Sequence, residues 1–396
     1  MASRRAELGL DAVNFFAAAV QTGFGPFIAV YLTLHHWTGL AIGAILSLGT
    51  IVAMASQIPA GALVDAMANK RLAGAVGLTA IGFSALLLAA LPTQFGVGVA
   101  EILHGFASCM VNPAIAAITL MVVRRDLLGE RLGRNMRFAS LGNGVAAAIM
   151  GAAGFWLSGV SVFILTALLV IPAIFSLASI ETKTASASQA APVHRPTFQE
   201  LRALFLDRRL LSFMACQALF QMADAAMLPY VGRKIAAEAG QSANPLIAVA
   251  LVLPQIVVAL LSPAVGRAAE SRGRRIVLMV GFASEPIRGL LFAIISPAVP
   301  LVLVQALDGI GAAVIGVLLP LIAADISRER GHFNLAMGAI GVAVGAGAAA
   351  STALAGTIDQ FYGNDSALFA LAGIGLLATA AVWLLMPESR VAPDAV

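Results

Sequence analysis

The segment Gly61-Ala-Leu-Val-Asp65 lies between two long apolar stretches and is followed by the basic pair Lys70-Arg71. A similar segment, Gly266-Arg-Ala-Ala-Glu270, occurs about 204 residues later and is followed by Arg272-Gly-Arg-Arg275. Each copy places a carboxylate at the end of one apolar stretch and cations at the start of the next. An internal repeat of this kind predicts a chain built from two similar halves.

The composition indicates that most of the outer surface faces lipid. Of the 396 residues, 60% are hydrophobic and only 11% are charged, whereas soluble domains carry about 25% charged residues. Because hydrocarbon offers no partner to backbone polar groups, apolar stretches in a membrane form helices or closed barrels. The stretches here run for about 20 residues or more without the alternation of a barrel strand, so we expect transmembrane helices.

Twelve apolar stretches are long enough to cross a membrane. Short junctions, such as His35-His-Trp37, force neighbouring helices to run antiparallel. We therefore predict an all-α membrane protein with twelve transmembrane helices in two pseudo-symmetric six-helix bundles. The predicted helices cover residues 8–34, 38–63, 72–91, 95–123, 137–158, 160–180, 210–231, 244–265, 276–296, 298–324, 333–357 and 366–387.

Two bundles and one linker are expected. The N-terminal bundle comprises residues 1–180, the C-terminal bundle comprises 210–396, and the cytoplasmic linker comprises 181–209. The linker begins with a flexible polar composition. It then contains Thr197-Phe-Gln-Glu200, a capping box that predicts a short amphipathic helix leading into the seventh stretch.

Basic residues indicate the orientation in the membrane. If the N-terminus is cytoplasmic, only Arg233, Lys234 and Arg288 among the 24 Lys and Arg residues fall outside the cytoplasmic side. Such a bias follows the positive-inside rule. We therefore expect a multi-pass protein of the cell inner membrane with both termini in the cytoplasm.

Polar residues inside the apolar stretches follow the same repeat. Glu101 and His104 match Gln305 and Asp308, and each pair precedes a glycine. Helical spacing places these residues on one face of each helix, which must point inward because lipid offers no partner. The residues expected to line an interior cavity and contact a substrate are Asn14, Gln21, Glu101, His104, Asn112, Gln217, Gln221, Asp224, Gln305 and Asp308.

The loop segments carry a resemblance to a known family. The second copy is close to the Gly-x-x-x-Asp-Arg-x-Gly-Arg-Arg signature of the major facilitator superfamily, with Glu270 replacing the acid. The first copy departs from it at Ala66 and Ala68, where Arg and Gly are usual. The chain resembles this superfamily over essentially its whole length. The resemblance implies alternating access, with the first, fourth, seventh and tenth helices lining a central cavity.

The same resemblance implies that the loops stabilise the outward-open state through charge pairs between helix ends. An anchoring role at the cytoplasmic surface is the alternative for these loop residues. Glu285 and Arg288, at i and i+3 beside a proline, form either a self-neutralised structural pair or a gate. The residues assigned to gating and conformational change are Asp65, Lys70, Arg71, Glu270, Arg274, Glu285 and Arg288.

A charge within a transmembrane helix costs about 3 kcal/mol or more and is usually kept for function. Burial disfavours the ionised form of a carboxyl group, so Glu101, Asp224 and Asp308 are assigned to proton coupling. Purely structural carboxyl groups are the alternative. His104, one helical turn from Glu101, could share its proton. Because the interior charges other than Arg288 are acidic, a neutral, zwitterionic or cationic solute fits better than a multivalent anion.

The predicted function is secondary active transport of a small organic solute, coupled to protons. The family's base rate slightly favours export, by antiport, of an amphipathic molecule. A proton symporter or uniporter for nutrient uptake is the first alternative. A transporter-like membrane sensor is the second, although the linker 181–209 is too short for an output domain.

The sequence lacks the motifs of several other classes. It has no nucleotide phosphate loop, no zinc-protease motif and no cysteine cluster for a metal. Cys109 and Cys216 both lie in apolar stretches and do not indicate a disulfide. We therefore expect no enzyme activity, no cofactor and no metal. The expected partners are a small-molecule substrate, protons and the lipid bilayer, without nucleic acid, and the chain is expected to be a monomer.

Overall fold

The computed structural model describes residues 4–24, 26–180, 198–239, 243–328 and 332–388. Regular secondary structure in these ranges is helical throughout. Twelve helical segments there are long and apolar enough to cross a membrane, with mean hydropathy between 1.3 and 2.6. The predicted fold class, an all-α membrane protein with twelve spans, is therefore confirmed. The twelve segments are numbered below as spans one to twelve in chain order.

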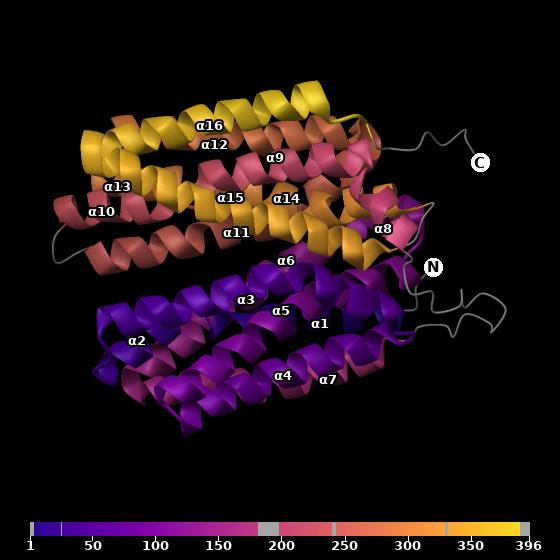
Figure 1. The fold of residues 1–396 in the computed structure, drawn as a ribbon, viewed down its shortest axis with the longest axis horizontal. Helices are drawn as coiled ribbons and strands as arrows, with labels where there is room; N and C mark the ends of the chain where they lie inside the picture. The colour runs from indigo at the N-terminus through magenta and orange to yellow at the C-terminus, as the bar shows by residue number, and fades with distance from the viewer. Residues whose placement is uncertain (1–3, 25, 181–197, 240–242, 329–331, 389–396) are drawn as a thin grey trace. The chain divides into compact units, whose positions relative to one another are not determined.

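The described helices fall into two compact units. Unit 1 comprises residues 1–196 together with 332–338. In this unit α4 packs beside both α5 and α7, and α1 packs against α6 and α7 (Figure 1). The helices of the first six spans are α1 (Arg4–Thr22), α2 (Pro26–Leu34), α3 (Gly39–Ala66), α4 (Lys70–Ala90), α5 (Gln94–Val122), the 3₁₀ turn η1 (Arg125–Leu127), α6 (Leu128–Trp156) and α7 (Gly159–Ser179).

Unit 2 comprises residues 197–331 and 339–396. Here α12 packs along α16, and α11 packs against α14, which repeats the arrangement of α4 with α7 and of α3 with α5. The helices are α8 (Phe198–Phe205), α9 (Arg208–Asp224), α10 (Met227–Ala239), α11 (Ala243–Arg272), α12 (Arg274–Ile294), α13 (Ala298–Val304), α14 (Ala306–Ser327), α15 (Phe333–Tyr362) and α16 (Asn364–Leu385).

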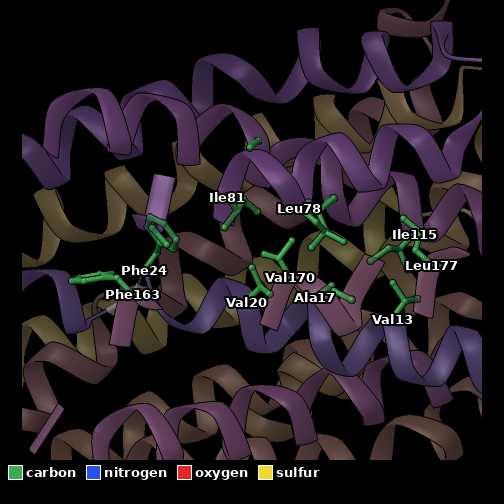
Figure 2. Packing of buried hydrophobic residues seen from close by; sticks show 14 of the residues in the cluster. Val13, Ala17, Val20, Phe24, Leu78, Ile81, Ile115, Phe163, Val170 and Leu177 are labelled. Carbon is green, nitrogen blue, oxygen red and sulfur yellow. The ribbon is translucent and has the colours of Figure 1, made fainter. Parts of the chain in front are cut away.

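Branched and aromatic side chains fill the core of unit 1. Val20 on α1, Ile81 on α4 and Val170 on α7 are buried in one cluster, and Phe24 and Phe163 extend it (Figure 2). Each fully buried side chain of this size contributes about 1.5–3 kcal/mol when it leaves water. The lipid environment removes part of this gain, so close packing contributes a larger share of the stability.

Small residues let helices approach closely at matching places in the two units. A Cβ atom on Gly142 of α6 would meet the backbone of Phe15 on α1. Equally, a Cβ atom on Gly347 of α15 would meet the backbone of Ala218 on α9. Both glycines therefore serve helix contact. The internal repeat seen in the loop segments thus extends to the packing of the helices.

The predicted limits of span five differ from the observed ones. The expected helix began at residue 137, but α6 begins at Leu128. Arg131, Arg134 and Asn135 obscured the first turns because they break the apolar pattern. These side chains find polar partners inside unit 1, so the helix tolerates them.

The short helix predicted before span seven is present as α8. Thr197, the first residue of the predicted capping box, lies outside the described residues, as does most of the linker. Asp207 caps the following helix, since its carboxylate accepts a hydrogen bond of 2.8 Å from the N–H of Arg209.

Candidate functional site

Three spans are interrupted near their polar residues. Span one changes from α1 to α2 between Thr22 and Pro26, and span seven changes from α9 to α10 between Asp224 and Met227. Span ten changes from α13 to α14 at Gln305. Non-helical backbone within a membrane is tolerated where protein or a polar cavity surrounds it, and broken helices often bind solutes.

The break in span seven is stabilised within unit 2. The N–H of Ala226 donates a hydrogen bond of 3.1 Å to the hydroxyl oxygen of Ser351 on α15, and Ser351 is fully buried. This bond replaces one that a continuous helix would supply. It fixes the end of α9, so the side chain of Asp224 is held at a helix terminus.

The break in span ten places a second carboxylate. Gln305 is the joint between α13 and α14, and Asp308 lies in the first turn of α14. A helix N-terminus carries a partial positive charge that favours a negative side chain. The backbone angles of Gln305 lie in the right-handed helical region, and the N–H of Asp308 donates a hydrogen bond of 3.1 Å to its carbonyl. The expectation that Gln305 and Asp308 share one face of span ten stays a prediction.

Arg288 on α12 joins both breaks. Its guanidinium bonds to the carboxylates of Asp224 and Asp308, and its Nη2 lies 3.0 Å from Oε2 of Glu285. Its Nε also contacts the sulfur of Met227 at 3.3 Å. These contacts bring together four predicted residues from three helices. The interpretation of Glu285 and Arg288 as a self-neutralised pair is incomplete, because two further carboxylates share the guanidinium.

The charges of this cluster do not balance. Asp224, Glu285 and Asp308 bring three carboxyl groups to a single guanidinium. Arg288 and Glu285 are each only 1% exposed, so solvent screens them little. The carboxylate oxygens lie within 4.8 Å of one another, a spacing that could hold a metal ion. The guanidinium of Arg288 already bonds at this place, and a metal ion would have to compete with it.

Two further predicted residues of unit 2 carry buried polar atoms. Neither the side-chain oxygen nor the side-chain nitrogen of Gln217 has a hydrogen-bond partner among the described residues. The side-chain oxygen of Gln305 has no partner there either. Both residues are at most 1% exposed. A buried amide without a partner costs about 1–3 kcal/mol, which is unusual outside functional places. Gln221 lies one turn before Asp224 and is half-buried.

Glu101 is the buried carboxyl group of unit 1. It lies on α5, and a Cβ atom on Gly49 of α3 would collide with its Oε2, so the glycine makes room for it. Its Oε1 is buried and has no hydrogen-bond partner in the described part of the chain. No ion pair to Glu101 is found there either.

The neighbours of Glu101 have other partners. His104 stacks on Phe24 with ring centroids 3.8 Å apart and an angle of 5° between the planes. The side chain of Gln21 donates to Asn112 at 3.4 Å, which links α1 to α5. Asn14 donates to the carbonyl of Leu10 in its own helix at 2.7 Å. The expected sharing of a proton between His104 and Glu101 has no direct bond among the described residues.

A buried ionic network in unit 1 was missed by the sequence analysis. Asp11 on α1 accepts from Arg131 at 2.6 Å and from Arg134 at 2.5 Å, both on α6. Arg131 also donates to Asn135 at 2.8 Å, and Asn135 donates to Thr119 on α5 at 2.9 Å. The spacing of Arg131, Arg134 and Asn135 on one helical face was the signal that could have revealed it.

The first loop copy uses backbone groups as partners. Oxygens of Asp65 accept from the N–H groups of Asn334 and Leu335 at 3.2 and 2.9 Å, and from the Asn334 side chain at 2.6 Å. Asp65 therefore caps the first turn of α15, whose residues up to Gly338 belong to unit 1 while the rest belong to unit 2. Lys70 donates to the carbonyls of Val64 and Asp65, and so caps the end of α3.

The second loop copy repeats the cap and adds ion pairs. Arg274 donates to the carbonyl of Ala269 at 2.8 Å, as Lys70 does to Asp65. It also pairs with Glu270 at 3.1 Å and with Asp325 at 3.2 Å. Arg71 donates to the carbonyl of Ile180 at 2.9 Å, at the end of α7. These residues bind helix ends in both copies, and their assigned role in gating stays a prediction.

Comparison with known proteins gives a consistent picture. The family model described as Major Facilitator Superfamily matches residues 10–240 and 213–396. An uncharacterized MFS-type transporter is 37% identical over 398 residues in two strains of Mycobacterium tuberculosis, CDC 1551 / Oshkosh and ATCC 25618 / H37Rv. The alignment covers 97% of this chain and 94% of each relative.

Solved structures share the fold. The crystal structure of the human organic anion transporter MFSD10 (TETRAN) aligns with a TM-score of 0.73 at 14% identity, covering 96% of this chain and 99% of that one. The E. coli fucose:proton symporter FucP aligns with a TM-score of 0.75 at 16% identity, covering 96% and 98%. At such low identity the likeness concerns the fold alone.

Proposed function

Since the chain belongs to the major facilitator superfamily, we propose that it couples the movement of a small organic solute to the movement of protons by alternating access. Membrane transport follows from the family, whose members are transporters and not enzymes. The proton coupling, the class of solute and the direction of transport are the proposal.

The surplus of carboxyl groups around Arg288 carries the proposal. Asp224, Glu285 and Asp308 would together leave two negative charges uncompensated if all were ionised beside one guanidinium. A buried surplus of charge is costly in a membrane. It is relieved when the cluster takes up a proton or a positively charged group of a solute. Exchange between these two is the simplest form of proton-coupled transport.

The same cluster favours neutral, zwitterionic or cationic solutes. An anion that approached Asp224 and Asp308 would meet like charges and would have to displace them from Arg288. A multivalent anion would be opposed most strongly. We assign the proton to Asp308 or Asp224 in unit 2 and to Glu101 in unit 1, each of which is a predicted coupling residue.

The proposed direction is export by proton antiport, with uptake by symport as the alternative. The proposed location is the cytoplasmic membrane with both termini inside, supported by the distribution of basic residues. Reporter fusions at the two termini, such as an alkaline phosphatase that is active only outside the cytoplasm, would test the orientation. An active phosphatase at either end would contradict it.

A ligand screen followed by transport tests the function. Purified protein in detergent is screened by thermal unfolding against a chemically diverse library at about pH 5.5 and 7.5. A solute at about a hundred times its Kd adds about 2.7 kcal/mol of stability. We expect no hits among multivalent anions, and we expect the pH-dependent shifts of the hits to disappear in Asp308→Asn. Hits confined to multivalent anions and indifferent to Asp308→Asn would overturn the proposal.

A further inference from the structure

The carboxylates around Arg288 differ in their access to solvent. The side chains of Asp224 and Asp308 are 24% and 28% exposed, whereas Glu285 is 1% exposed. The two aspartates are therefore partly accessible at the surface of the described residues, and the glutamate is not. Asp224 and Asp308 lie at the two helix breaks, so their positions are fixed by backbone geometry.

Glu285 has spare capacity as an acceptor. Neither of its oxygens has a hydrogen-bond partner among the described residues, although Nη2 of Arg288 lies 3.0 Å away in an ion pair. An ionised carboxylate can accept about four hydrogen bonds. The absence of a side chain at Gly311 on α14 leaves room for Oε1, because a Cβ atom there would lie 2.8 Å from it. Glu285 is therefore a buried carboxyl group that faces Arg288 with its bonding capacity unused.

Two of the contacts of Arg288 are weak, so a small rotation of its guanidinium breaks them at low free-energy cost. Its Nε contacts the sulfur of Met227, a weak and deformable acceptor. The ring of Phe292 lies 5.9 Å from its Cζ, at the outer limit of a cation–π contact. The hydrogen bonds of Arg288 to Asp308 and Asp224 and its ion pair with Glu285 are its strongest contacts, so they decide where its guanidinium lies.

We propose that the solute carries one cationic group, of the size and planarity of an amidinium or guanidinium, which replaces Arg288 at Asp224 and Asp308. Arg288 then turns to Glu285, which receives it with the oxygens that have no hydrogen-bond partner in the described residues. Arg288 acts as a tethered counter-cation that occupies the solute's place in the absence of solute. The proposal rests on the proposed transport function and names the class of solute.

With all three carboxyl groups ionised, the exchange lowers the surplus of negative charge from two to one. With solute absent, Arg288 serves three carboxyl groups; with solute present, the new cation serves the aspartates and Arg288 serves Glu285. A neutral group cannot replace the guanidinium, because it would leave the aspartates without a cation in a weakly screened place. An anion would add to the surplus. Competition with Arg288 lowers the apparent affinity in proportion to the fraction of molecules in which the binding position is free of Arg288.

The test measures equilibrium binding of three probes of nearly equal shape to the full-length protein in detergent. The probes are benzamidinium, neutral benzamide and anionic benzoate. Isothermal titration calorimetry measures their binding. The variants are Arg288→Met, Glu285→Gln and the double variant with both changes. Loss of Arg288 alone raises the surplus of negative charge from two to three, whereas the double variant keeps it at two. Arg233→Met is the matched control, since Arg233 pairs with Asp359 at 2.7 Å elsewhere in unit 2.

We expect benzamidinium to bind the wild type and neither benzamide nor benzoate to bind. Removal of the tethered cation, in Arg288→Met or in the double variant, should tighten benzamidinium binding about tenfold or more. Glu285→Gln alone should weaken it about tenfold, because Arg288 has lost its second partner. Arg233→Met should leave it unchanged.

Other results would overturn the inference. A place that holds the guanidinium of Arg288 must accept an amidinium once Arg288 is gone, so failure of benzamidinium to bind the folded double variant contradicts it. Equal binding of benzamide does the same, as does a Glu285→Gln variant with unchanged affinity. Because the titration uses no membrane and no proton gradient, these failures leave the proton-coupled function to be tested separately by transport.

Discussion

Unit 1 and unit 2 repeat the same helix packing but treat their interior charges differently. In unit 1, Glu101 lies buried beside Gly49, and no cation pairs with it among the described residues. In unit 2, the matching span holds Asp308 at a helix break, bonded to Arg288 together with two more carboxylates. The repeat therefore preserves backbone contacts, such as those of Gly142 and Gly347, while the polar chemistry has diverged.

The two units differ in where their buried arginines lie along the helices. In unit 1, Arg131 and Arg134 pair with Asp11 near the start of α1 and α6. In unit 2, Arg288 is in the second half of α12, at the level of the helix breaks. In the described residues, unit 1 thus keeps Glu101 apart from its arginines, and unit 2 gathers three carboxyl groups around one arginine.

Removal of Arg288 should have the largest effect on stability. Arg288→Leu leaves three carboxyl groups in unit 2 without their cation, and loss of one partner of a buried ion pair costs about 3–5 kcal/mol. Equilibrium unfolding of the purified protein in mixed micelles measures the loss. Arg233→Leu is the control, since this arginine is 56% exposed in its pair and should cost about 1 kcal/mol or less. Equal losses of unfolding free energy in the two variants would contradict the special role of Arg288 in unit 2.

Substitution of Asp11 should have the next largest effect on stability. Asp11→Asn weakens two bonds to buried or half-buried arginines, and hydrogen bonds to charged groups contribute about 1.5–3 kcal/mol. The same unfolding measurement gives the value, with Asp126→Asn as control because Asp126 pairs with Arg124 at the exposed surface. If Asp11→Asn lost no more than Asp126→Asn, the ionic network of unit 1 would not contribute to its stability.

Loss of the cap at α15 should have a smaller effect on stability. Asp65→Ala removes an acceptor from the N–H groups of Asn334 and Leu335, and loss of a helix N-cap costs about 0.5–2 kcal/mol. Hydrogen–deuterium exchange should show faster exchange in the first turn of α15. Unchanged exchange there in Asp65→Ala would contradict the capping role. Asn69→Ala, which removes the cap of α4, gives a reference of the same kind.

Glu101→Gln should have the smallest effect on stability. The carboxyl group of Glu101 has an oxygen with no hydrogen-bond partner in the described residues, so an amide of the same size loses no known bond. We expect a change below about 1 kcal/mol in the unfolding measurement, within the range of ordinary substitutions. A loss as large as that of Arg288→Leu would reveal a partner and remove the contrast between the units.

Much of the fold could be predicted from the sequence, for a physical reason. A membrane span requires a long apolar segment, and twelve such segments can be recognised by their length alone. The boundary of span five could not be predicted because Arg131 and Arg134 lie inside a helix and are neutralised by Asp11. That pairing depends on tertiary contacts between residues far apart in the chain.

The candidate site was only partly predictable. The polar residues of the interior could be found because charges in apolar stretches are conspicuous, as for Asp224, Glu285 and Asp308. Arg288 could be found in the same way, but its bonds to Asp224 and Asp308 could not, since helical spacing relates residues within one helix and not between three. Ser351, which holds the break in span seven, also escaped notice, because a lone serine in an apolar helix usually bonds to its own backbone.

Proton movement across proteoliposomes tests the central claim most directly. A pH-sensitive dye inside the vesicles is followed when a solute identified by the thermal screen is added to wild-type protein and to Asp308→Asn. We predict solute-dependent proton movement with the wild type and a loss of about tenfold or more in Asp308→Asn, because the proton and the solute share the cluster around Arg288. Solute transport by the wild type without proton movement, or unchanged coupling in Asp308→Asn, would contradict the account.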